Sequence, residues 1–132
     1  MTDFLLRFII AGGVMGALDA LWLMFVANKF YKSQIGNLLL DKPNTTPALI
    51  FYVIYIVGIV AFVIAPALEK GSLVHAVGYG ALFGLVAYAT YDLTNLSTLK
   101  GFTSKVVIVD LFWGVFMTAT AAGITYLVLH KS

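Results

Sequence analysis

The stretch that decides the fold is PNTTPALIFYVIYIVGIVAFVIAPAL, residues 43–68, which lies between Lys42 and Glu69 and contains no charged side chain. Two further uncharged runs follow it, at residues 71–91 and 111–130. A helix needs roughly 20 apolar residues to cross the hydrocarbon core of a bilayer. Each of these runs is therefore long enough to form a transmembrane helix.

The composition of the whole chain also indicates a membrane protein. Of its 132 residues, 61% are hydrophobic and 11% are charged, whereas soluble domains carry about 25% charged residues. The apolar content excludes intrinsic disorder, and the absence of cysteine excludes a disulfide scaffold, thiol catalysis and thiolate metal sites. Because the net charge is only +2, we expect no nucleic-acid partner.

We expect an all-α fold, an integral membrane four-helix bundle that forms a single membrane domain over residues 1–132. The first hydrophobic stretch could be mistaken for a signal peptide, but it is long and contains Asp19, so we expect a transmembrane helix. Thr46 and Ser104 are the expected N-caps of the second and fourth helices, and Pro66 is expected to end the second. The expected crossings cover residues 4–27, 47–66, 73–95 and 105–129.

The connection between the first and second crossings, residues 28–46, is longer than the others. Its apolar residues follow helical spacing, with polar residues between them. This pattern predicts a short helix lying in the headgroup layer, while a polar loop with a few leucines is the alternative. The apolar residues are Tyr31, Ile35, Leu38 and Leu39.

Basic residues are unevenly shared between the two sides of the membrane. The first and third loops carry five of them and the opposite side carries three, which favours an orientation with both termini outside. The opposite orientation stays open. The five are Lys29, Lys32, Lys42, Lys100 and Lys105, and the three are Arg7, Lys70 and Lys131.

Three aspartates, Asp19, Asp92 and Asp110, lie inside the expected crossings. A carboxylate within a membrane is costly and usually functional. Counted from the helix ends at the helical rise, all three belong to the half of the bundle nearest the first and third loops. The sequence leaves open whether they face one another, because each helix is free to rotate about its axis.

Each of the two tryptophans follows an aspartate by three residues, so each pair shares one helical face. We interpret these pairs as part of a polar ligand-binding site in the bundle interior. An aromatic belt at the membrane interface is the alternative explanation for the tryptophans. The predicted ligand-binding residues are Asp19, Trp22, Tyr88, Tyr91, Asp92, Asn95, Asp110 and Trp113.

Small residues four apart predict the faces on which helices pack closely. They lead along the first, third and fourth crossings toward the aspartates, so we expect the carboxyl groups to lie at or beside tightly packed seams. The small residues are Gly12 and Gly16 in the first crossing, Gly80 and Gly84 in the third, and Gly114, Thr118 and Ala121 in the fourth.

The run YDLTNLSTLKG, residues 91–101, is dense in hydroxyl, amide and carboxyl groups where the third helix leaves the membrane. One interpretation is a lid or a headgroup-contact loop, in which Thr94 and Lys100 contact lipid headgroups. The other is a capped helix followed by an ordinary loop.

Neither histidine joins the aspartates, since His75 lies near the opposite side and His130 near the C-terminus. We therefore expect no metal site and no cofactor. The chain also carries no hydrolase or nucleotide-binding motif, so no catalytic residue is assigned, and a binding protein is favoured over an enzyme.

Three segments together resemble a bacterial family of small membrane proteins catalogued as domain of unknown function 2177. They are LDALWL at residues 18–23, YDLTNL at residues 91–96 followed by TLK at 98–100, and DLFWG at residues 110–114. The resemblance implies a four-helix, multi-pass protein of the bacterial inner (plasma) membrane without an established activity, sometimes associated with lipid-modification genes.

Three functions are open on these features, and membrane lipids are expected partners in each. The favoured one is binding and transport of a small amphipathic or cationic molecule coupled to protons, with Asp19 as the exchanging acid and a homodimer enlarging the enclosed volume. The second is a membrane-embedded enzyme or accessory subunit in lipid modification. The third is purely structural, with polar residues that specify helix packing.

Overall fold

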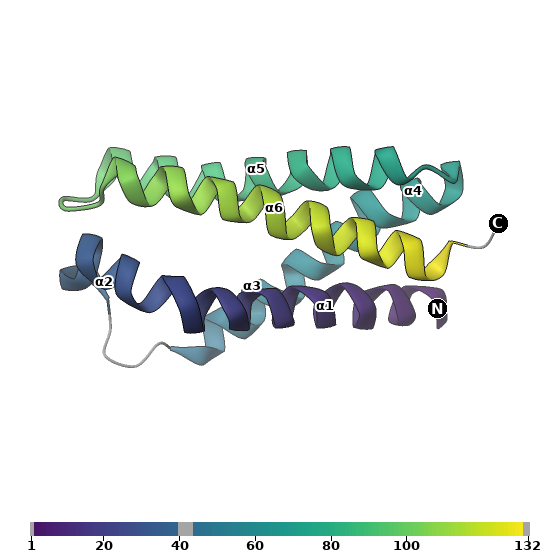
Figure 1. The fold of residues 1–132 in the computed structure, drawn as a ribbon, viewed down its shortest axis with the longest axis horizontal. Helices are drawn as coiled ribbons and strands as arrows, with labels where there is room; N and C mark the ends of the chain where they lie inside the picture. The colour runs from purple at the N-terminus through teal and green to yellow at the C-terminus, as the bar shows by residue number, and fades with distance from the viewer. Residues whose placement is uncertain (1, 40–43, 131–132) are drawn as a thin grey trace.

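The computed structural model describes residues 2–39 and 44–130, which form a bundle of helices with no β-strand among them (Figure 1). The first half of this part of the chain consists of α1 (Thr2–Trp22), the π-helix η1 (Leu23–Ala27), α2 (Asn28–Ile35) and the 3₁₀ turn η2 (Gly36–Leu38). The second half consists of α3 (Thr45–Ile59), the π-helix η3 (Val60–Ile64), α4 (Ala65–Lys70), α5 (Leu73–Thr98) and α6 (Ser104–Leu129).

Within these described ranges, four helical stretches are long and apolar enough to cross a membrane: Asp3–Val26, Thr45–Lys70, Leu73–Thr98 and Ser104–Leu129. The all-α membrane bundle predicted from the sequence is therefore confirmed. Large apolar side chains point outward from every stretch, and Phe25, Phe62, Val74 and Phe112 are 71–83% exposed. Lipid tails cover such a surface at no cost, whereas water would not tolerate it.

The bundle has two distinct ends (Figure 1). Both chain termini and the turn between α4 and α5 lie at one, the terminal end; α2 and the turn between α5 and α6 lie at the other, the α2 end. Gly71 makes the α4–α5 turn with φ 64°, a left-handed conformation that glycine adopts without strain. The Ser72 hydroxyl then accepts a hydrogen bond from the His75 amide and starts α5.

Two predicted helix caps were wrong by one or two residues. Asn44, and not Thr46, caps α3, because its side-chain oxygen accepts a hydrogen bond from the Thr46 amide. Thr103, and not Ser104, caps α6 by accepting from the Val106 amide. In both places two good capping residues lie close together, so the sequence alone could not choose between them.

Pro66 does not end the second crossing, which corrects the prediction from sequence. The helix runs on through α4 to Lys70, after the π-helical turn η3. In that turn the Ala65 amide bonds the Val60 carbonyl five residues back. Proline has no amide hydrogen to donate, and a wide turn directly before it accommodates the missing bond, so the helix continues.

Residues 28–38 are helical, so the polar-loop alternative for this connection is wrong there. Ile35 is buried in a small cluster with Phe102, Val106 and Val107, and Tyr31 packs against the same cluster. The inner face of α2 thus covers the start of α6, where we had expected it to lie on headgroups. Asp41, Lys42 and Lys131 lie outside the described residues.

Helices α5 and α6 approach most closely of all. A Cβ atom on Gly84 would lie 2.3 Å from the Gly114 carbonyl oxygen, and one on Gly80 would lie 3.0 Å from the Ala122 Cβ. The predicted seam between the third and fourth crossings is therefore present. In α1 the prediction holds for Gly12, whose added Cβ would lie 3.1 Å from Ile56, but no described atom comes within 4 Å at Gly16.

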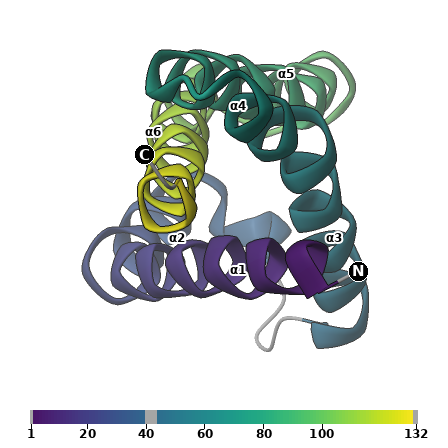
Figure 2. The same ribbon diagram turned by 90° about the vertical axis from the view of Figure 1, so that its right-hand side faces the viewer.

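The helices surround a central core, and α3 forms one side of the bundle (Figure 2), inclined to the other helices (Figure 1). Residues 44–51 of this crossing are exposed, while Tyr55, Ile56 and Ile59 toward the end of α3 are buried. The first half of α3 therefore stands away from α5, and its second half joins the bundle. This divergence leaves the side of the bundle between α3 and α5 accessible to lipid.

We predict that Gly84→Ala lowers the free energy of unfolding in detergent by about 1–3 kcal/mol, because the added methyl group collides with the α6 backbone. The matched control is Gly78→Ala on the same helix, where no described atom lies within 4 Å of the added methyl group. Equal stabilities of the two variants would show that the α5–α6 contact does not hold the bundle together.

Candidate functional site

Asp19 joins three helices through its carboxylate. Its two oxygens accept a hydrogen bond from the Tyr52 hydroxyl on α3 at 2.7 Å and another from the Trp113 indole nitrogen on α6 at 3.0 Å. Hydrogen bonds to a charged acceptor are the stronger kind. Asp19 therefore cross-links α1, α3 and α6, and its charge is met by two fixed donors.

The two aspartate–tryptophan pairs interlock instead of acting separately. The Trp22 ring stacks on the Trp113 ring with centroids 4.4 Å apart and planes inclined by 10°. Trp113, which follows Asp110 in the sequence, donates its hydrogen bond to Asp19 on α1. The Trp113 indole N–H therefore bonds a residue of another helix, which an interfacial belt alone does not require.

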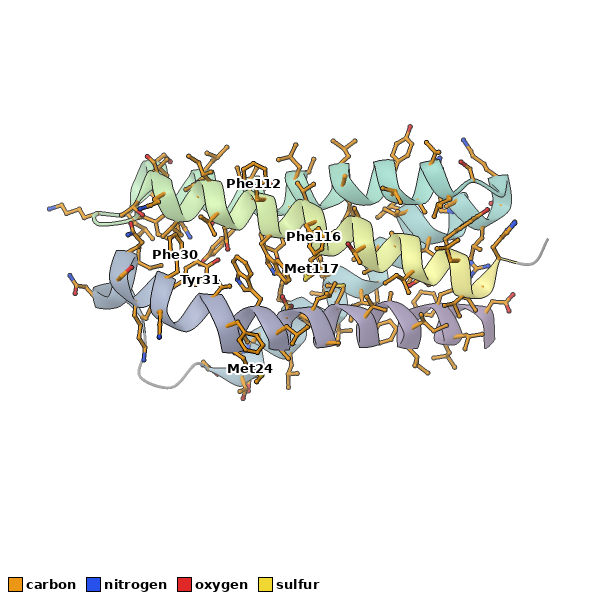
Figure 3. All side chains as sticks on the ribbon, in the orientation of Figure 1. Met24, Phe30, Tyr31, Phe112, Phe116 and Met117 are labelled. Atoms are coloured by element: carbon orange, nitrogen blue, oxygen red, sulfur yellow. The ribbon has the colours of Figure 1, made fainter. Side chains whose placement is uncertain are left out.

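Asp110 accepts a hydrogen bond from the Tyr31 hydroxyl, which extends from α2 toward α6 (Figure 3). Burial raises the pKa of Tyr31, and the neighbouring Asp110 carboxylate raises it further. A raised pKa keeps the phenol protonated at neutral pH, so Tyr31 stays a hydrogen-bond donor to Asp110.

Asp92 is completely buried, with 0% of its surface exposed. Its carboxyl group lies beside that of Asp110. No described residue donates a hydrogen bond to either Asp92 oxygen. Buried polar groups are nearly always hydrogen-bonded, so this carboxyl group calls for an explanation.

Tyr88 is held in place by its packing against two neighbouring helices. Its ring lies against the backbone of Gly114, where an added Cβ atom would come within 2.4 Å of it. Tyr55 packs edge-on against it with centroids 6.2 Å apart, and Tyr55 is itself tied to Thr118 by a 2.7 Å hydrogen bond. Tyr88 is therefore held by packing from α3 and α6.

A pocket of about 400 Å³ lies where α3 stands away from α5. Phe51 contributes one wall, Ala87, Tyr88 and Tyr91 of α5 contribute another, and Asp110 supplies a carboxylate. Phe51 and Tyr91 are 51% and 60% exposed, so the pocket opens sideways between the helices. Its walls are mainly aromatic and apolar, and Asp110 is the one acidic residue that lines it.

The structure brings most of the predicted site residues into two adjacent groups. Tyr88, Tyr91 and Asp110 line the pocket with Asp92 behind them, while Asp19, Trp22 and Trp113 form a separate cluster. Asn95 is half-buried nearer the α2 end.

Thr94 and Lys100 are both exposed, so their contact with headgroups stays a prediction. Helix α5 continues to Thr98, and the chain then turns through Gly101, which has φ 83°. This backbone agrees with a capped helix followed by a short loop. The Ser97 and Thr98 hydroxyl groups both donate hydrogen bonds to the Thr94 carbonyl oxygen. Two polar side chains of this segment are therefore hydrogen-bonded within the helix itself.

Sequence reasoning missed Phe51 and Ala87, which line the pocket, and the two tyrosines Tyr31 and Tyr52. The two tyrosines did give a usable signal, because a phenol inside or next to an apolar run needs a polar partner. That signal could not identify the partners, which lie 79 residues away for Tyr31 and 33 for Tyr52. Phe51 gave no signal, since it sits among many other apolar residues of α3.

In the part of the chain that the structure describes, the potential metal-ligating side chains do not gather into a metal site. No group of three or more histidine, aspartate or glutamate side chains comes close enough there to hold an ion. Asp92 and Asp110 form a pair, and their surroundings are tyrosines.

Comparison with known proteins identifies a family. The family model described as "Predicted membrane protein (DUF2177)" matches residues 4–127, which is nearly the whole chain. No curated protein and no solved structure matches.

We predict that Asp19→Leu lowers the free energy of unfolding in detergent by about 1–3 kcal/mol, because Tyr52 and Trp113 lose their acceptor. Asp19→Asn should cost less, since an amide oxygen can accept from Trp113 while the amide group donates to the Tyr52 oxygen. Asp3→Leu, at an exposed position near the terminal end, is the control. Equal losses in Asp19→Leu and Asp3→Leu would contradict a cross-linking role for Asp19.

Proposed function

The chain belongs to the DUF2177 family of membrane proteins, and within that frame we propose that it binds a small cationic amphipathic molecule in the pocket between α3 and α5. The observation that carries the proposal is the Asp110 carboxylate, which lines an aromatic pocket on the lipid-facing side of a membrane bundle.

Charge and wall chemistry select the class of ligand. A carboxylate in an apolar setting attracts a cation, because little water is present to screen the interaction. The faces of Tyr88, Tyr91 and Phe51 also attract cations through their ring quadrupoles. A cationic headgroup next to Asp110, with an apolar tail along Phe51 and Ala87, uses every wall of the pocket.

Size and access support the same ligand. Sites for small molecules commonly measure roughly 300–1,000 Å³, and this pocket of about 400 Å³ is at the small end. It suits one short-chain amphiphile better than a two-chain phospholipid. An amphiphile dissolved in the bilayer would reach it sideways, past the exposed Phe51 and Tyr91 side chains.

The proposal assigns Asp19 a structural role. We had expected Asp19 to be the exchanging acid, but its two oxygens already accept hydrogen bonds from Tyr52 and Trp113. A carboxylate bound in this way has less to gain from a ligand than Asp110, which faces the pocket. Asp110 therefore becomes the ligand's counter-ion in the proposal.

Transport of the bound molecule is the extended form of this function. Moving a ligand across the membrane requires helices that can rearrange, and π-helical turns are frequent at functional sites. One such turn, η1, directly follows Trp22, and the other, η3, interrupts the second crossing. A second copy of the chain would enlarge the enclosed path, so a homodimer remains part of the transport proposal.

The proposed location is the bacterial inner membrane, with both termini outside. Among the described residues, the α2 end carries Lys29, Lys32, Lys100 and Lys105, and the terminal end carries Arg7 and Lys70. Basic residues favour the cytoplasmic side.

Because the chain has no cysteine, the orientation can be tested by labelling single cysteines from outside the cell, in the variants Ser72→Cys and Ser33→Cys. Labelling of Ser72→Cys alone supports the proposed orientation. Labelling of Ser33→Cys alone shows the opposite orientation.

A role in lipid modification stays the alternative function. The sideways opening of the pocket favours this alternative, because a lipid carrying an amine could place its headgroup next to Asp110. The lipid composition of a deletion strain tests this alternative, and an unchanged composition would rule against it.

The binding proposal predicts that decyltrimethylammonium binds the protein in lipid nanodiscs, and that Asp110→Asn weakens its binding about tenfold or more through loss of the charge pair. Uncharged decyl glucoside and anionic decyl sulfate, which share the tail, should bind far more weakly. Asp3→Asn is the matched control, since Asp3 lies at the terminal end and should leave affinity unchanged. Equal affinity of wild type and Asp110→Asn would refute the proposed site.

A further inference from the structure

The Asp92 carboxyl group is the one group of the site that the binding proposal leaves unexplained. It is fully buried, no described residue donates a hydrogen bond to it, and it does not line the pocket. It lies beside Asp110, which does line the pocket and which accepts a hydrogen bond from the Tyr31 hydroxyl.

Two ionised carboxylates cannot be neighbours here without a large cost. An ionised group buried without hydrogen bonds is strongly disfavoured, and a second negative charge beside it adds repulsion in a medium of low dielectric constant. Adjacent carboxyl groups resolve this conflict by sharing one proton, as in the dyads of aspartic proteases. Asp92 then becomes a donor whose acceptor, the Asp110 carboxylate, is already in place.

We propose that Asp92 and Asp110 hold one proton between them, and that binding of the cationic molecule at Asp110 displaces this proton. The inference rests on the proposed function and identifies the proton as the ion that is exchanged for the ligand. Asp110 binds the ligand, and Asp92 holds the proton.

The exchange balances in charge. Before binding, one carboxylic acid and one carboxylate carry a net charge of −1. When the cation arrives, the O–H bond of the acid breaks, the proton leaves to water, and two carboxylates with one bound cation again carry −1. The net charge of the pair with its ligand is thus the same in both states, and the bound cation offsets the negative charge that the departing proton exposes.

The other titratable groups that face the pair do not compete for this role. They are phenols, Tyr31 from α2 and Tyr88 and Tyr91 from α5, while Asp19 of α1 accepts hydrogen bonds from Tyr52 and Trp113. The raised pKa of Tyr31 keeps that phenol neutral at the pH values where carboxyl groups exchange protons. The exchange therefore takes place within the aspartate pair.

The test is the affinity for decyltrimethylammonium in nanodiscs, measured between about pH 5 and pH 9, which covers a broad range around neutral pH for proton exchange by paired carboxyl groups. In wild type the affinity should rise with pH by up to about tenfold per unit, because one proton leaves for each cation bound. A weakly buffered sample should release about one proton per ligand at neutral pH. In Asp92→Asn both the pH slope and the proton release should disappear, whatever affinity remains, and Asp3→Asn should behave as wild type.

Infrared spectroscopy of the ligand-free protein provides an independent measurement. Wild type at neutral pH should show the C=O stretch of a protonated carboxylic acid, shifted by ¹³C-labelled aspartate and absent in Asp92→Asn. A missing band in wild type would overturn the proposal whether or not any ligand binds. Binding that is independent of pH would also overturn it and leave the binding function standing.

Discussion

The contact on which the site depends is the close approach of the α5 and α6 backbones at Gly84 and Gly114. Helices come this near only where both lack side chains, because a methyl group on Gly84 would overlap the Gly114 carbonyl oxygen. The contact fixes how the two helices face each other. One turn beyond Gly84, Tyr88 lies on Gly114; a further turn on, Asp92 lies beside Asp110.

Three aspartates in the same half of the bundle have three different environments, and the differences suggest different roles. Asp19 accepts hydrogen bonds from two other helices, which suits a cross-link. Asp110 accepts a hydrogen bond from Tyr31 and lines the pocket, which suits a counter-ion. Asp92 has no donor among the described residues and is fully buried, which suits a proton carrier. Hydrogen bonding, more than depth in the membrane, separates them.

The helices and the three aspartates could be predicted from sequence because both depend on local composition. Long uncharged runs can hardly be anything other than membrane helices, and carboxyl groups within them stand out. The partners of the aspartates could not be predicted, since Tyr31 and Tyr52 meet them only through the relative rotation of helices. The predicted helix end at Pro66 was wrong because the effect of a proline depends on the turn before it. The predicted close packing at Gly16 was wrong because the spacing of small residues does not say which helix lies opposite.

The central claim, that a cationic amphiphile binds beside Asp110, is tested most directly by an experimental structure with an alkyltrimethylammonium ligand carrying bromine at the end of its tail. The account predicts the headgroup next to the Asp110 carboxylate and the bromine along Phe51 and Ala87, between α3 and α5. Bromine located only elsewhere, for example in the hollow beside Arg7 and His130 at the terminal end, would contradict it.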